Sequence, residues 1–200
     1  MKNLILCLGS LFCLYSCTAT TPKNTRDICA VFKEKDGWYN DAKESSKKWG
    51  IPIHISMAIM HQESRFVADA QPPRPWLLGI IPWFRSSSAY GYAQAQDGTW
   101  NDYIDKHGNW GADRDDFADA CDFIGWYCAI SRKKLGISLW DTQKLYLAYH
   151  EGHGGYKRKT YLKKPWLINT AKKVAKKSQQ FNAQLLTCKE ELESNSWFFW

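Results

Sequence analysis

The chain has 200 residues, a length that suits one ordinary domain with its own hydrophobic core. Its 11 Trp and 10 Tyr against only 13 Gly and 7 Pro exclude fibrous and disordered proteins. The net charge of +7 is concentrated between residues 152 and 188, where no acidic residue occurs, and this favours an acidic wall polymer or an anionic membrane surface as partner; a solvated helix face explains it equally well.

The N-terminus has the pattern of an export signal. Lys2 precedes the apolar run Leu4–Tyr15, which is too short to cross a bilayer and is typical of a signal peptide. The run ends in "LYSC", which resembles a bacterial lipoprotein signal; this resemblance implies a signal peptide over residues 1–16 and a lipid on Cys17. Residues 17–25 then form a tether, and a plain secreted protein is the alternative.

These features predict the location of the protein. Thr18, rather than an Asp, follows Cys17, which fits the periplasmic face of an outer membrane if the cell is Gram-negative. We therefore expect a protein of the cell envelope that the lipid holds at the membrane. Export makes nucleic acid an unexpected partner, and we expect a monomer.

Export also places the remaining cysteines where disulfides persist. Cys121 and Cys128 lie seven residues apart in one predicted helix, so their Cα atoms are ~10 Å apart. A disulfide spans no more than ~7 Å, and we expect two separate buried thiols. Cys29 and Cys188 flank the folded region, and we expect a disulfide between them, with two free thiols as the alternative.

Helical periodicity dominates the sequence, and strand alternation is nearly absent. Gly50 ends the second predicted helix, Asp113 and Gly136 cap the fifth, and Asp141 begins the sixth, which ends in a glycine cluster. The pattern predicts a single all-α domain over residues 26–193, followed by an aromatic tail over residues 194–200. The predicted helices cover residues 26–35, 36–50, 51–64, 96–108, 113–136, 138–150 and 165–193.

Residues 68–94 break the helical pattern with four prolines and the serine run Ser86–Ser88. Long loops without secondary structure are usually functional or disordered. The aromatic and aliphatic residues between positions 76 and 84 argue against disorder. We therefore expect an ordered aromatic flap over a cleft.

Three short motifs occur in a characteristic order. They are "HQESRF" with Glu63 and Ser64, "YGYAQA" with Gly91 and Gln94, and "YLAYHEG" with Tyr149. Together they resemble the E-S, G-[LY]-x-Q and A-Y-N motifs of the soluble lytic transglycosylase (SLT) catalytic domain. The resemblance covers roughly residues 28–175, is closest to a lipoprotein branch of that superfamily, and implies an α-helical, lysozyme-like fold.

The resemblance implies an enzyme that binds peptidoglycan glycan strands and cleaves the β-1,4 bond between N-acetylmuramic acid and N-acetylglucosamine. Glu63 would be the single acid and base, and the N-acetyl group of the substrate would attack to give a 1,6-anhydromuramyl end without a cofactor. The acid must stay protonated near neutral pH to protonate a poor leaving group, and apolar surroundings favour the protonated form.

The resemblance also assigns roles to other residues. Tyr149 would hydrogen-bond the acid, Gly91, Tyr92 and Gln94 would line the sugar sites, and Ser64 would steady the substrate or the backbone of Glu63. Ordinary structural interpretations remain for single residues. In these, Gln94 is a surface amide, Tyr149 a core aromatic and Ser64 a capping hydroxyl.

The third motif departs from the family pattern. His150 stands where the motif has Asn, and Glu151 adds a second carboxylate among the substrate-binding candidates. A hydrolytic, lysozyme-type muramidase therefore stays an alternative, as does a non-catalytic peptidoglycan-binding lipoprotein. The segment from His150 to His153 is one residue short of H-E-x-x-H, and glycines interrupt its helix, so we expect no metal.

Overall fold

The computed structural model describes residues 19–78, 80–82, 84–107 and 110–195. The expected signal peptide, Cys17 and residues 196–200 lie outside these ranges. None of the described helices combines the length and the apolar character needed to span a bilayer. The elements are α1 (Ile28–Glu34), α2 (Trp38–Trp49), α3 (Ile53–Glu63), β1 (Trp76–Leu77), β2 (Ile81–Pro82), α4 (Asp97–His107), α5 (Phe117–Leu135), α6 (Thr142–Lys157), the 3-10 helix η1 (Thr160–Lys163) and α7 (Pro165–Asn195).

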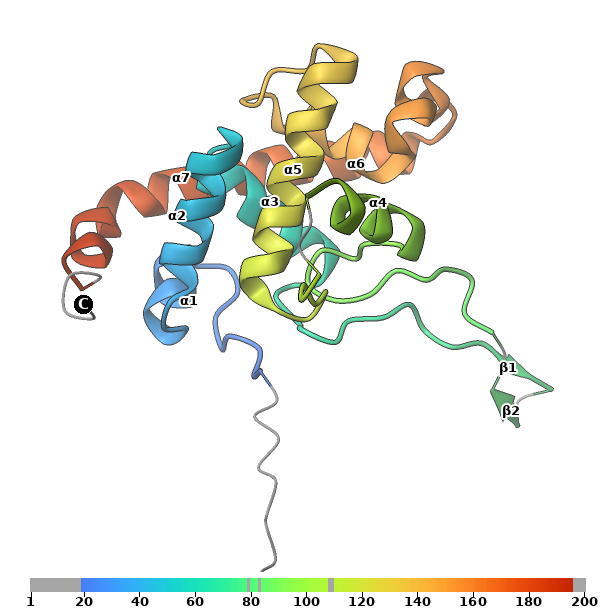
Figure 1. Cartoon of the computed structure of the whole chain (residues 1–200), viewed down its shortest axis with the longest axis horizontal. Helices are drawn as coiled ribbons and strands as arrows, with labels where there is room; N and C mark the ends of the chain where they lie inside the picture. Colours follow the sequence, from blue (N-terminus) through green and yellow to red (C-terminus); the bar gives the residue numbers. More distant parts are fainter. Residues whose placement is uncertain (1–18, 79, 83, 108–109, 196–200) are drawn as a thin grey trace, which may run out of the picture.

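The helices form one all-α domain around α3, which confirms the predicted fold class (Figure 1). Six consecutive residues of α3, from Ile55 to Met60, are buried, so this helix is enclosed on every side. It packs against α2, α5 and the long helix α7. A buried central helix fixes its last residue, Glu63, more firmly than a surface helix could.

Helices α2 and α5 approach closely because α5 has a glycine at the contact. A Cβ on Gly125 would lie 2.4 Å from the indole ring of Trp49. Ser45 donates a hydrogen bond to the carbonyl of Cys121 at 2.7 Å, and the Trp49 indole donates to Asp122 at 2.8 Å. These contacts hold α5 against α2, and α5 in turn supplies one wall of the cleft described below.

Most helix ends follow the sequence signals. Gly50 and Gly136 end α2 and α5 in the left-handed conformation, and Asp141 caps α6. The predicted cap at Asp113 is wrong, because the side chain of Asp116 caps α5 by accepting from the amide of Asp119.

The expected end of the sixth helix at the glycine cluster is also corrected. Gly152 has a non-helical conformation (φ 71°, ψ 158°) that bends α6, but the helix resumes and continues to Lys157. Glycine tolerates the positive φ that this bend requires.

The segment expected to form a flap leaves the helical body as two legs that end in the antiparallel pair β1 and β2 (Figure 1). We call residues 70–90 the arm. Among the described residues of the arm, Ser87 and Ala89 at its base border the cleft, while its tip extends away from the helices. At the tip, Leu78 and Ile80 are 84% and 75% exposed. The expectation that this segment covers the cleft is therefore wrong for the tip.

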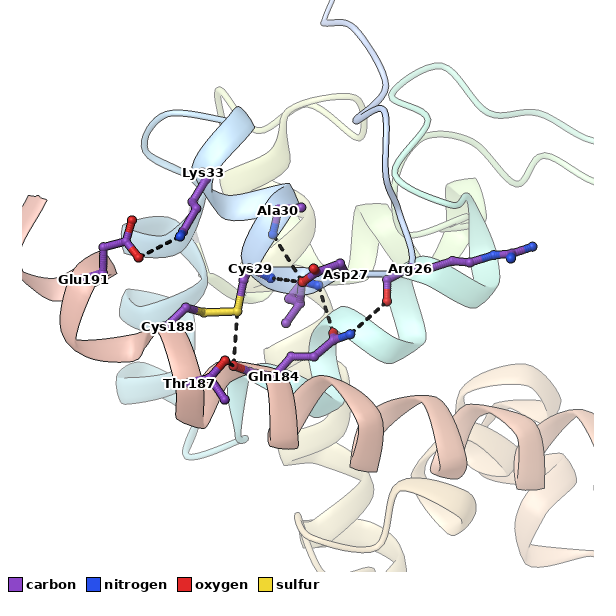
Figure 2. The surroundings of a disulfide bond; sticks show 10 residues. Arg26, Asp27, Cys29, Ala30, Lys33, Gln184, Thr187, Cys188 and Glu191 are labelled. Carbon is purple, nitrogen blue, oxygen red and sulfur yellow. Dashed lines mark hydrogen bonds and ion pairs between the residues drawn. A yellow bond between two sulfur atoms is a disulfide. The ribbon is translucent and has the colours of Figure 1, made fainter.

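A disulfide between Cys29 and Cys188 joins α1 to α7, as expected (Figure 2). It links residues 159 positions apart and is flanked by an ion pair between Lys33 and Glu191 at 2.6 Å. Gln184 accepts a hydrogen bond from the amide of Ile28 at 3.0 Å. The other two described cysteines, at positions 121 and 128, are separate buried thiols, as predicted.

Candidate active site

Glu63 is the last residue of α3, and a strained turn directly follows it. Arg65 and Phe66 both have positive φ angles, 53° and 64°, a conformation that non-glycine residues rarely adopt. The Ser64 hydroxyl accepts from the amide of Phe66 at 3.2 Å and donates to the carbonyl of Met60 at 3.3 Å. Ser64 is buried and fastens the turn, while Phe66 is fully buried below it. This turn positions the backbone of Glu63.

The Glu63 carboxyl opens onto a cleft of about 400 Å³. The cleft lies between the helices and the base of the arm, and aromatic side chains from α5 and α6 form one wall. Its described lining consists of Glu63, Ser87, Ala89, Gln94, Ala95, Gln96, Thr99, Phe123, Tyr127, Tyr149, His150, Glu151 and Gly152.

Burial dominates the electrostatics of Glu63. The residue keeps some surface toward the cleft, but its Oε1 atom is buried and has no hydrogen-bond partner among the described residues. Burial raises the pKa of Glu63 from 4.5 to about 7, and a hydrogen bond with Tyr146 lowers it only partly. Near neutral pH the group therefore exists in both its protonated and ionised forms, which is the condition for acid and base catalysis by one carboxyl.

Of the two tyrosines, Tyr146 and not Tyr149 is the one whose hydroxyl lowers the pKa of Glu63. The Tyr149 hydroxyl, expected to bond the acid, instead donates to the carbonyl of Ala93 at 2.6 Å. Burial, followed by the nearby charge of Glu63, raises the pKa of both tyrosines, so both stay protonated donors. Tyr146 lies three residues before Tyr149 on the same face of α6, and this helical spacing was the signal that could have identified it.

Glu151 lines the cleft but is held by neighbouring side chains. Its side chain is only 3% exposed, and it accepts from Lys164 at 2.7 Å and from the hydroxyl of Thr160. Burial raises its pKa, but the hydrogen bonds of Lys164 and Thr160 and the charge of Lys164 outweigh burial, so the pKa is lowered. Glu151 is thus an ionised anchor between α6 and η1.

The loop before α4 brings the second motif to the cleft. Gly91 has φ 80°, and a Cβ there would lie 2.0 Å from the carbonyl oxygen of Arg114, so only glycine fits. The side-chain amide of Gln94 donates hydrogen bonds to the backbone carbonyls of Ala70 and Gly91 at 2.7 and 3.0 Å. Gln94 thus both lines the cleft and closes the loop that forms one of its edges.

Tyr92, expected among the sugar-binding residues, is only 1% exposed and is not part of the cleft lining. Its ring packs edge-on against Trp38 and Phe117, whose rings are stacked 3.8 Å apart. Tyr92 therefore anchors the loop in the core.

The two histidines of the third motif have different surroundings. His150 lines the cleft, with Nδ1 3.4 Å from Glu151, and its ring packs edge-on against Trp166 at 5.2 Å. His153 stacks on Tyr127 and contacts the hydroxyl of Ser131 at 3.0 Å. Across the described ranges, no group of three or more His, Cys, Asp or Glu side chains is arranged to hold a metal ion.

Sequence reasoning missed several cleft residues that no short motif contains. Phe123 and Tyr127 lie one helical turn apart on α5, and this spacing on a predicted helix could have indicated a shared aromatic face. Ser87 and Ala89 come from the base of the arm, and no local signal distinguishes them.

An all-α domain with a half-buried glutamic acid at the end of a central helix defines the lysozyme-like class. A family model described as "Transglycosylase SLT domain" matches residues 5–188, and the chain belongs to this family. Membership implies transglycosylase activity toward peptidoglycan in general terms. No curated protein and no solved structure matched the chain.

Proposed function

We propose that the protein is a lytic transglycosylase that cleaves the bond between N-acetylmuramic acid and N-acetylglucosamine and leaves a 1,6-anhydromuramyl end. The observation that carries this proposal is the buried carboxyl of Glu63, which lines the cleft and has a pKa of about 7. The chain that carries this carboxyl belongs to the SLT family.

The reaction requires two proton transfers at one carboxyl. Protonated Glu63 gives its proton to the glycosidic oxygen as the bond to C1 of the muramyl ring breaks, and the carbonyl oxygen of the N-acetyl group bonds to C1. The ionised Glu63 then takes the proton of the 6-hydroxyl, whose oxygen displaces the N-acetyl oxygen from C1. No water is consumed, and Glu63 ends protonated as it began.

The state of Glu151 favours this route over a hydrolase with two carboxylates. A second carboxylate must be free to attack the sugar or to activate water. Glu151 instead accepts from Lys164 and Thr160 and is almost completely buried. Glu63 is therefore assigned both proton transfers.

We also propose that a lipid on Cys17 anchors the enzyme at the membrane, on the periplasmic face of an outer membrane. The "LYSC" segment and the short tether that follows it support this proposal. Metabolic labelling with a fatty acid tests it, because Cys17→Ser should abolish the label and release the protein from the membrane fraction. A label that persists in Cys17→Ser would contradict the anchor.

The enzymatic proposal is tested by digesting purified peptidoglycan sacculi and weighing the released muropeptides. The parent should release products one water lighter than reducing-end muropeptides, and Glu63→Gln should release none. Glu190→Gln, an exposed change on α7, is the matched control and should behave as the parent does. Equal release by the parent and Glu63→Gln would overturn the role of Glu63.

A further inference from the structure

A second cavity, of about 460 Å³, adjoins the cleft at the base of the arm. Three arginines line it: Arg74 and Arg85 from the two legs of the arm, and Arg114 from the loop before α5. Ser87 and Ala89 line both this cavity and the cleft of Glu63, so the two hollows share a wall. We call this cavity the arginine pocket.

The pocket has an excess of positive charge. Arg114 pairs with Asp97 at 2.8 Å, so its charge is balanced within the pocket. Arg74 has no ion pair within the described ranges, and Arg85 uses its Nε to donate to the carbonyl of Pro72 at 3.0 Å. The charges of Arg74 and Arg85 therefore remain available to a ligand.

Hydrogen bonds hold one wall of the arginine pocket in place. Arg114 donates to the carbonyls of Ser88 and Ala95 at 3.1 and 2.9 Å, and its guanidinium lies 5.3 Å from the ring centre of Tyr90. Tyr90 in turn donates to Asp115 at 2.8 Å. Arg74 and Arg85, both exposed, thus line the pocket beside a wall that hydrogen bonds hold in place, where an anionic group can reach them.

We infer that the arginine pocket binds carboxylates of the stem peptides that branch from the glycan strand; this rests on the proposed function. In peptidoglycan the muramyl residue bears the peptide and the glucosamine does not, so a strand in the cleft must direct the branch sideways. The shared wall at Ser87 and Ala89 places the arginine pocket directly beside the cleft. Guanidinium groups match carboxylates with two parallel hydrogen bonds, which lysines on a surface do not provide.

The pocket makes the enzyme selective for strands that carry peptides. The test compares intact sacculi with glycan strands from which an amidase has removed the peptides. For Arg74→Ala/Arg85→Ala, kcat/KM on sacculi should fall about 10- to 100-fold, the loss expected for hydrogen bonds to charged groups. On peptide-free strands kcat/KM should equal that of the parent.

Two control variants distinguish the loss of the arginine pocket from a general loss of positive charge and from structural damage to the arm. Lys172→Ala/Lys173→Ala removes two exposed charges from α7 and should leave both substrates unaffected. Arg74→Ala alone removes no hydrogen bond or ion pair between described residues of the arm and should give part of the loss on sacculi. A loss of equal size on both substrates, or no loss on either, would overturn the inference.

A binding measurement makes the test independent of catalysis. A purified peptide-bearing muropeptide, titrated calorimetrically, should bind the parent more tightly than Arg74→Ala/Arg85→Ala by the same factor. Equal affinities would overturn the inference even if the parent cleaved neither substrate. If the parent cleaves neither substrate but binds the muropeptide more tightly than the variant, the inference about the arginine pocket is supported and only the proposed function is rejected.

Discussion

At the scale of single residues, the same side-chain type has opposite roles at two positions of the cleft. Glu63 has one carboxyl oxygen without a hydrogen-bond partner among the described residues, and burial raises its pKa to about 7. The Glu151 side chain is only 3% exposed but has Lys164 and Thr160 as donors, and its pKa is lowered. Burial leaves Glu63 able to donate a proton near neutral pH, whereas its donors and the charge of Lys164 keep Glu151 ionised.

The raised pKa of Glu63 predicts how stability depends on pH. Between pH 4.5 and about 7 the folded chain binds more protons at Glu63 than the unfolded chain, so this residue lowers stability progressively as pH rises through that window. The rise in pKa corresponds to about 3 kcal/mol. At pH 8, Glu63→Gln should therefore increase the free energy of unfolding by up to about 3 kcal/mol, and near pH 4 the two proteins should match.

Urea denaturation at both pH values measures this difference. Glu190→Gln, whose side chain is exposed on α7, is the control and should show no pH-dependent gain over the parent. A parent that is as stable as Glu63→Gln at pH 8 would show that Glu63 titrates as an ordinary surface carboxyl.

Tyr146 should influence the alkaline limit of activity through its effect on the pKa of Glu63. Its hydrogen bond favours the ionised form of Glu63, so Tyr146→Phe should raise the pKa of Glu63 further. A hydrogen bond to a charged group is worth about 1.5–3 kcal/mol, which corresponds to a shift of about 1 to 2 pH units. The alkaline limb of the pH–rate profile should move upward by this amount.

Tyr149→Phe is the natural comparison, because the Tyr149 hydroxyl bonds the carbonyl of Ala93 and not the acid. It should shift the alkaline limb less than Tyr146→Phe does. A larger shift in Tyr149→Phe would restore the role that the family motif assigns to that tyrosine.

At the scale of elements, the bend in α6 determines where its aromatic and charged residues lie. Gly152 interrupts the helical conformation directly after Glu151, and Glu151 is tied to η1 through Thr160 and to the start of α7 through Lys164. The half of α6 that precedes the bend therefore carries Tyr146 and Tyr149 and is tied at its end, through Glu151, to Thr160 and Lys164.

This arrangement predicts a structural role for Glu151. Glu151→Gln should lower the free energy of unfolding by about 1–3 kcal/mol, because it weakens partly buried hydrogen bonds, one of them to the charged Lys164. Below its unfolding temperature the variant should retain activity on sacculi, unlike Glu63→Gln. Loss of activity in Glu151→Gln without loss of stability would instead indicate a second catalytic carboxylate and favour the muramidase alternative.

At the scale of the whole molecule, α1 and the C-terminal half of α7 close the domain from opposite ends of the sequence (Figure 2). The disulfide Cys29–Cys188 encloses nearly all of the helical core. By the chain-entropy model, Cys29→Ala/Cys188→Ala should lower the free energy of unfolding by about 2–5 kcal/mol.

Thermal unfolding with and without a reductant checks this prediction. Reductant should lower the melting temperature of the parent toward that of the double variant and leave the variant unchanged. A parent that is insensitive to complete reduction would show that packing alone holds α1 in place.

The parts of the structure that follow from local patterns were predictable from the sequence. The all-α fold class follows from apolar spacing, the helix ends at Gly50 and Gly136 from their backbone freedom, and the disulfide from the positions of its cysteines. The local pattern predicts the cap of α5 at Asp113 and not at Asp116, because several aspartates precede that helix and each fits the signal.

Features that depend on distant contacts were not predictable. The sequence places Glu151 among the substrate-binding candidates as a second carboxylate, because its partner Lys164 lies 13 residues further along the chain and no local pattern pairs the two. The arm was expected to cover the cleft because its apolar residues suggested packing, yet Leu78 and Ile80 are exposed. Neither the pairing of charges nor the direction of a long loop is determined by local sequence.

The central claim is that Glu63 completes the reaction without water, and digestion of sacculi in oxygen-18-labelled water tests it most directly. The released muramyl ends should contain no oxygen-18 and should have the mass of the anhydro form. Incorporation of one labelled oxygen at each new end would contradict the claim and identify the protein as a hydrolase.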